Sequence, residues 1–168
     1  MQKLLSPAQV IEFKKRETLE SIVARRVEFL TAYQNAAYAD TYKAYVAKVR
    51  AGADAAITQY FYNSDAYFRF VEDAHRLGAD VPVVPGIMPI SSSTQLMRFS
   101  DACGAEIPRW IRLRLQSFGD DTASIKAFGL DVVTDLCDQL RTAGVPALHF
   151  YTMNQSAATL EICRRLGI

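Results

Sequence analysis

From Gly52 onward the chain alternates short apolar segments with longer helical patterns, and this alternation restricts its fold more than any other feature. The segments typical of buried strands are 55–62, 83–90 and 147–153. Predicted helices cover 63–77, 93–103, 108–118, 122–143 and 154–166, with Asn63 or Ser64 capping the first and Asn154 the last. Parallel strands need long crossover connections, which helices of this length supply. The sequence therefore predicts an α/β fold with a parallel sheet.

The part of the chain before this alternation lacks a strand pattern and has no proline after Pro7, so we expect it to be helical. Ser6, Pro7 and Gln9 form a helix start: a capping serine, a proline at the first helical position, and a glutamine three residues after the cap. Apolar residues then recur every three or four positions. We expect two helices that are separated by a break within residues 34–40.

Composition excludes several classes of partner. With 19 Lys and Arg against 18 Asp and Glu, the net charge is +1, which gives no electrostatic reason to expect nucleic acid or an anionic membrane as partner. No apolar stretch approaches the ~20 residues of a membrane-spanning helix. Three widely separated cysteines, an odd number, indicate neither a disulfide framework nor a CxxC metal knuckle. We expect a cytoplasmic protein.

The motif search singles out Gln59, a polar residue that we expect to be buried within the apolar run "AITQYFY". Burial of such a side chain costs roughly 1–3 kcal/mol unless it is hydrogen-bonded. Either a ligand or a neighbouring loop could supply the partner. His75 and His149 have no Cys or carboxylate neighbour at metal-ligand spacing, so we expect structural roles for both and no metal site.

Four segments resemble the C-terminal part of bacterial methylenetetrahydrofolate reductase: "KVRAGADAAITQYFYN", "VPVVPGIMPI", "CGAEIPRWIR" and "LHFYTMNQSAATLEICRRLG". That family is a flavin-dependent (β/α)₈ barrel that reduces methylenetetrahydrofolate with electrons from a reduced nicotinamide. The resemblance covers residues 48–168 and implies a partial barrel, namely the last three parallel strands with their helices. An N-terminal helical hairpin would precede it.

The resemblance also implies roles for individual residues. It places Gln59 against flavin and folate, and it places Gln95 and Phe99 of "SSSTQLMRFS" against folate, four residues apart on one helical face. Tyr151 stands where the family has a tyrosine on the flavin side, and Lys48 remains from the helix that meets the cofactor. These positions lie toward the C-terminal ends of strands, which form the catalytic face of such barrels.

The chain also departs from the family pattern. The family's acidic glutamate near the first strand and its flavin-tuning aspartate after the fourth strand have no counterpart here. Thr41, Ala44 and Ala47 occupy positions next to Lys48 that meet the cofactor in the family, and Gln155 stands where an arginine is common. We therefore expect that this chain does not retain FAD and that the fragment is inactive alone.

Residues 19–48, "LESIVARRVEFLTAYQNAAYADTYKAYVAK", resemble the tail of an indolepyruvate:ferredoxin-type oxidoreductase. This second resemblance implies a chimera of a helical segment, residues 1–47, and a reductase-like partial barrel, residues 48–168. Two hypotheses follow: a folate reductase fragment with weak folate or flavin binding, or a non-catalytic folded chimera that self-associates. Removal of five barrel strands would leave open sheet edges, so we expect a homo-oligomer.

Overall fold

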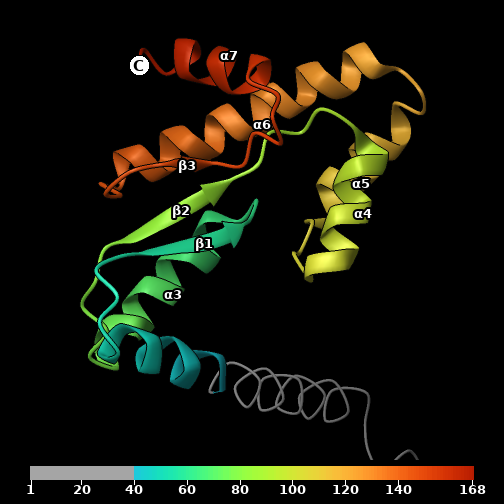
Figure 1. The fold of residues 1–168 in the computed structure, drawn as a ribbon. Helices are drawn as coiled ribbons and strands as arrows, with labels where there is room; N and C mark the ends of the chain where they lie inside the picture. The colour runs from blue at the N-terminus through green and yellow to red at the C-terminus, as the bar shows by residue number, and fades with distance from the viewer. Residues whose placement is uncertain (1–39) are drawn as a thin grey trace, which may run out of the picture. The chain divides into compact units, whose positions relative to one another are not determined.

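The computed structural model describes residues 40–168 (Figure 1). Helical backbone covers residues 40–50. Residues 46–168 form one compact unit, and the residues before them belong to another. The predicted capping box and most of the predicted helical hairpin lie outside the described residues.

The compact unit is built on a sheet of three parallel strands in the order β1-β2-β3 (Figure 1). These strands are β1 (Ala56–Tyr60), β2 (Val83–Ile87) and β3 (His149–Phe150). Ala56 is the register partner of Val83, and Gly86 is the partner of His149. The predicted fold class, α/β with the last three strands of a (β/α)₈-type barrel, is confirmed.

Helices connect the strands as the sequence predicts. They are α3 (Ser64–Arg76), α4 (Ser93–Cys103), α5 (Arg109–Ser117), α6 (Thr122–Thr142) and α7 (Ala157–Arg165). Asn63 caps α3 by accepting a hydrogen bond from the Asp65 amide at 3.1 Å. Figure 1 shows α4 and α5 beyond the arrowheads of β1 and β2, where the strands end. This arrangement brings α4 to the C-terminal edge of the sheet.

The two faces of the sheet differ in burial. Val83, Pro85 and Ile87 alternate along β2 onto one face and are all buried. Core side chains from α6 and α7 are buried as well; they are Val133, Leu136, Leu140 and Ile162. On β1, by contrast, Ile57 is 54% exposed. Within the described residues, helices therefore cover one face of the sheet and leave part of β1 open.

Two predictions at the last strand are wrong. β3 was expected over 147–153 but covers only His149–Phe150. Beyond it, Met153 and Asn154 have left-handed backbone angles, φ 50° and 59°, so the extended chain could not have continued to 153. Asn154 is also not the cap of α7. Ser156 holds the cap position, without a side-chain hydrogen bond.

Gly129 of α6 fixes how closely this helix approaches the segment that follows β2. A Cβ atom at Gly129 would collide with the carbonyl oxygen of Ile90 and would lie 2.7 Å from the Ile90 Cβ. Both neighbouring groups are close to the backbone and cannot rotate away. Because Gly129 has no side chain, the segment that leads from β2 to α4 can pack directly against α6.

We predict that Gly129→Ala lowers the free energy of unfolding by roughly 1–3 kcal/mol, because the added methyl group overpacks this contact. Chemical denaturation measures the change. The exposed residue Ala127, two positions earlier on α6, supplies the control: Ala127→Gly should cost about 1 kcal/mol through helix propensity alone. A Gly129→Ala protein that is more stable than the wild type would contradict the close contact.

Candidate functional site

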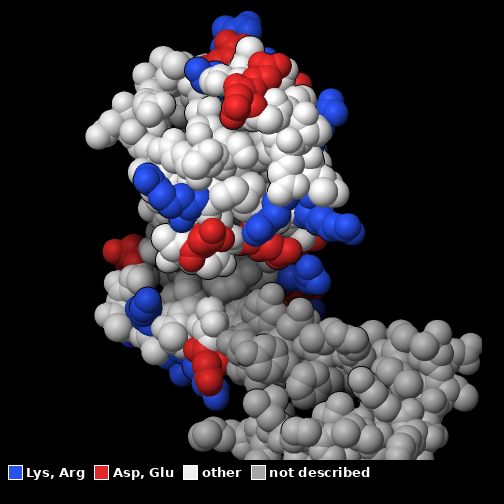
Figure 2. All heavy atoms as spheres, turned by 90° about the vertical axis from the view of Figure 1, so that its right-hand side faces the viewer, with Lys and Arg blue, Asp and Glu red and all other residues white. Residues whose placement is uncertain are grey.

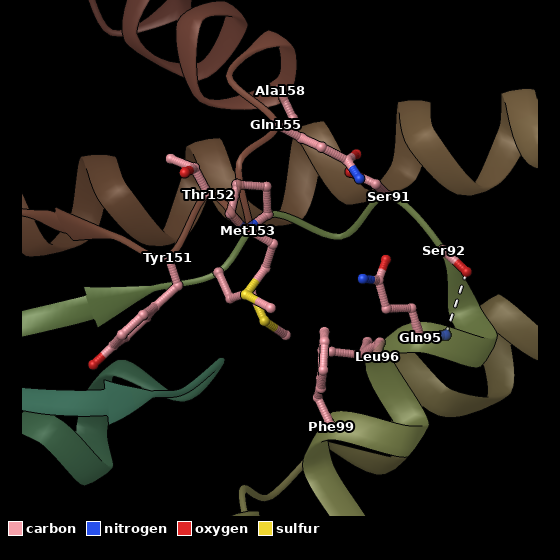
Figure 3. Close-up of a pocket in the computed structure, with 12 residues that line it drawn as sticks. Ser91, Ser92, Gln95, Leu96, Phe99, Tyr151, Thr152, Met153, Gln155 and Ala158 are labelled. Atoms are coloured by element: carbon pink, nitrogen blue, oxygen red, sulfur yellow. Dashed lines mark hydrogen bonds between the residues drawn. The ribbon is translucent and has the colours of Figure 1, made fainter.

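A pocket lies at the C-terminal edge of the sheet, between α4 and the loop that joins β3 to α7 (Figure 3). Its cavity volume is about 30 Å³, and the pocket is otherwise open to solvent. Its lining residues are Met88, Pro89, Ser91, Ser92, Gln95, Leu96, Phe99, Tyr151, Thr152, Met153, Gln155 and Ala158. Barrels built of parallel strands place their sites at this edge, so the pocket is the candidate site.

The α4 wall of the pocket follows from helix geometry. Ser92 caps α4 by accepting a hydrogen bond from the Gln95 amide at 3.3 Å. Leu96 is 2% exposed and anchors the helix in the core. Gln95 and Phe99 lie four residues apart, both half-buried, and Figure 3 shows them facing Met153 across the pocket. The predicted common face of this pair is therefore present.

The opposite wall begins at Tyr151. Its amide donates to the Ile87 carbonyl at 2.7 Å, which continues the β2–β3 ladder, and its hydroxyl donates to the Thr58 carbonyl at 3.0 Å. The ring needs the space beside Gly86, since a Cβ atom there would lie 2.7 Å from a Tyr151 ring carbon. A Cβ atom at Gly86 would also collide with the Thr58 carbonyl oxygen, so glycine at this position allows both the close approach of β1 and the passage of the Tyr151 ring over β2.

Tyrosine hydroxyls hold the pocket's supporting elements together. The Tyr60 hydroxyl and the Ser100 hydroxyl are 3.0 Å apart, and the Cys103 thiol donates to Tyr60 at 3.4 Å, which connects β1 to α4. Burial, followed by the hydrogen bond from Cys103, raises the pKa of Tyr60. The Tyr62 hydroxyl donates to the Met88 carbonyl at 3.0 Å, and burial raises the pKa of Tyr62 as well. Both groups are neutral donors or acceptors at physiological pH.

The structure brings three of the predicted site residues together and leaves two apart. Gln95, Phe99 and Tyr151 line one pocket. Gln59 does not line it, and the expectation that Gln59 is buried is wrong: its side chain is exposed, and its Oε1 atom accepts from the neighbouring Tyr60 amide at 3.1 Å. β1 is an edge strand of the described sheet, so its polar residue can face outward. Lys48 is exposed and also does not line the pocket.

Sequence reasoning missed two parts of the lining. Met88 and Ser91 follow β2, and Thr152 and Met153 follow β3. The rule that sites lie beyond the C-terminal ends of parallel strands could have indicated both segments. Gln155 was noted only as a departure from a family pattern, whereas here it contributes a neutral polar group to the pocket.

The pocket lining contains no Lys, Arg, His, Asp or Glu side chain. Figure 2, which faces the right-hand side of Figure 1, shows acidic and basic residues mixed over the described surface on that side. Within residues 40–168, no group of three or more His, Cys, Asp or Glu side chains could hold a metal ion. None of the helices in that range is long and apolar enough to cross a bilayer. The site thus offers aromatic, thioether, hydroxyl and carboxamide groups without charge.

Comparisons with known proteins identify relatives. Residues 27–167 match the sequence model of the family described as methylenetetrahydrofolate reductase. The 5,10-methylenetetrahydrofolate reductase of Salmonella typhimurium is 36% identical over 121 residues, which are 72% of this chain and 41% of that protein. A probable methylenetetrahydrofolate reductase (NADH) of Oryza sativa subsp. japonica is 38% identical over 121 residues, which are 72% of this chain and 20% of that protein. The chain thus spans less than half the length of these relatives.

A solved structure shares the fold. It is described as an uncharacterized protein from Clostridium thermocellum that binds two copies of 5-methyl-5,6,7,8-tetrahydrofolic acid. The superposition has a TM-score of 0.54 with 19% sequence identity, and it covers 81% of this chain and 51% of that one. At this identity the similarity concerns the arrangement of helices and strands.

Proposed function

Because the chain belongs to the methylenetetrahydrofolate reductase family, we propose that its pocket binds a reduced folate and that this chain alone does not catalyse the reduction. One observation carries the proposal: Gln95, Phe99 and Tyr151, which the family resemblance assigned to folate and flavin, line the same pocket. They come from α4 and from the end of β3, so the fold and not the sequence order brings them together.

The chemistry of the pocket suits the ring portion of a folate. Phe99 and Met153 provide an aromatic ring and a thioether, which make favourable contacts with a flat heterocycle. The Gln95 carboxamide has no hydrogen-bond partner among the described residues and offers both a donor and an acceptor to ring atoms. A lining without charge favours the neutral rings over the carboxylates of the tail, which the open side would leave in water.

FAD, the cofactor of the family, does not fit the residues present. Cationic side chains commonly bind its diphosphate, and the pocket lining itself contains none. Lys48, the remaining basic position of the family's cofactor helix, is exposed and does not line the pocket. We therefore propose no hydride-transfer step for this chain.

A second candidate is a non-catalytic protein that self-associates through its sheet. Within the described residues, β1 and β3 each pair with β2 alone, and Ile57 on β1 is 54% exposed. This candidate includes a chimeric origin, in which the residues before 48 come from an indolepyruvate:ferredoxin-type oxidoreductase by recombination. The family match begins at residue 27 and gives that origin no support.

We predict that the protein binds 5-methyltetrahydrofolate and that Gln95→Ala and Phe99→Ala each weaken binding about tenfold, through loss of about 1.4 kcal/mol of contact free energy. Isothermal titration calorimetry measures the dissociation constants. Thr94→Ala, on the exposed side of α4, is the matched control and should bind as the wild type does. Absence of wild-type binding at millimolar ligand would refute the proposed function.

We predict that the purified chain does not retain FAD at one equivalent and does not oxidise NADH with methylenetetrahydrofolate. The reason is the lining without cations. Incubation with excess FAD, gel filtration and an absorption spectrum test the first part, and a coupled NADH assay tests the second. Flavin absorption at one equivalent per chain would contradict the prediction.

We predict self-association at micromolar concentration, because β1 is an edge strand of the sheet within residues 40–168 and carries an exposed apolar side chain. Sedimentation equilibrium should give a mass above the 18.7 kDa of one chain. Ile57→Lys should shift the equilibrium toward monomer, whereas Leu160→Lys, at a position on α7 that is 64% exposed, should leave it unchanged. A wild-type monomer would show that the edges are satisfied within one chain.

A further inference from the structure

Two consecutive residues of the β3–α7 loop have backbone angles that are rare for side chains of their kind. Among residues 40–168, Met153 and Asn154 are the non-glycine residues with positive φ, at 50° and 59°. Such a conformation costs on the order of 1–3 kcal/mol for a non-glycine residue, with asparagine among those that tolerate it best. Backbone strain of this kind concentrates at functional sites, and here it lies at the rim of the pocket.

The left-handed pair determines which side chains reach the pocket. It reverses the chain between Tyr151 and α7, and the turn is closed by the Gln155 amide, which donates to the Thr152 carbonyl at 2.8 Å. Met153 and Gln155 line the pocket, as Figure 3 shows, whereas Asn154 between them does not. α7 begins at Ala157, and Ser156 at its cap position makes no side-chain hydrogen bond, so the left-handed turn leads directly into the helix.

Asn154 contributes through its backbone. Its side chain is exposed and makes no hydrogen bond with another described residue. A contact role for this side chain would require a partner in that part of the structure, whereas a conformational role requires only a residue that accepts positive φ. Asparagine meets that requirement better than other non-glycine residues.

We propose that Asn154 is a positioning residue, whose left-handed backbone directs Met153 and Gln155 into the pocket and so sets its affinity for the ring portion of a folate. The affinity part of this inference rests on the proposed function. The part that concerns the placement of Met153 does not.

Three variants separate positioning from general stability. Asn154→Gly keeps the left-handed conformation and should bind 5-methyltetrahydrofolate within twofold of the wild type. Asn154→Ala disfavours that conformation and should bind about tenfold more weakly. The matched control is Gly119→Ala, because Gly119 has a similar φ of 54°, open space around its Cβ position, and no place in the pocket lining. It should lower the melting temperature as Asn154→Ala does, with unchanged folate affinity.

A second measurement, ¹³C-methyl methionine NMR without ligand, decides the inference independently of folate binding. Asn154→Ala should shift the Met153 methyl resonance, because that methyl group would leave the neighbourhood of the Phe99 and Tyr151 rings, while Asn154→Gly and Gly119→Ala should leave it in place. An unchanged Met153 resonance in Asn154→Ala would overturn the inference. If the resonance shifts and the wild type binds no folate, the positioning role stands and the proposed function fails.

Discussion

The pocket depends on β2, the central strand of the described sheet, because the elements around the site are bonded to it or to the segment that follows it. β1 and β3 pair with its two edges. The hydroxyl of Tyr67 donates to the Val83 carbonyl at 2.7 Å, and that of Tyr62 donates to the Met88 carbonyl just beyond the strand. Strand pairing and buried tyrosine hydrogen bonds thus set the positions of α3 and of the pocket residue Met88 relative to β2.

Two glycines allow the close contacts that join β2 and the segment after it to the walls of the pocket. At Gly86 the Tyr151 ring occupies the space that a side chain would need, and at Gly129 the Ile90 backbone does the same. Both contacts lie on the path from β2 to a pocket wall: the first places the β3–α7 wall, and the second places the segment that enters α4. Close backbone approach is a use of glycine that requires no unusual φ angle, which neither residue has.

The pocket takes its lining from the strand ends and helices of one three-stranded sheet. That lining offers aromatic, thioether, hydroxyl and carboxamide groups and contains no charged side chain. The chain spans 41% of the Salmonella typhimurium enzyme. The proposal of ligand binding without catalysis takes that difference into account, since transition-state stabilisation needs several positioned groups acting together.

The sequence alone determined the local elements. The bounds of α4, a cap at Asn63 or Ser64, and the common helical face of Gln95 and Phe99 depend on caps and periodicity, which act over a few neighbouring residues. The parallel arrangement of the strands followed from the helical length of the segments between them. Only the tertiary structure decided that Gln59 is exposed and that Met153 lines a pocket. Burial and orientation depend on which distant segments pack against a residue. An edge strand and a left-handed turn are defined by such long-range packing, which a local pattern does not encode.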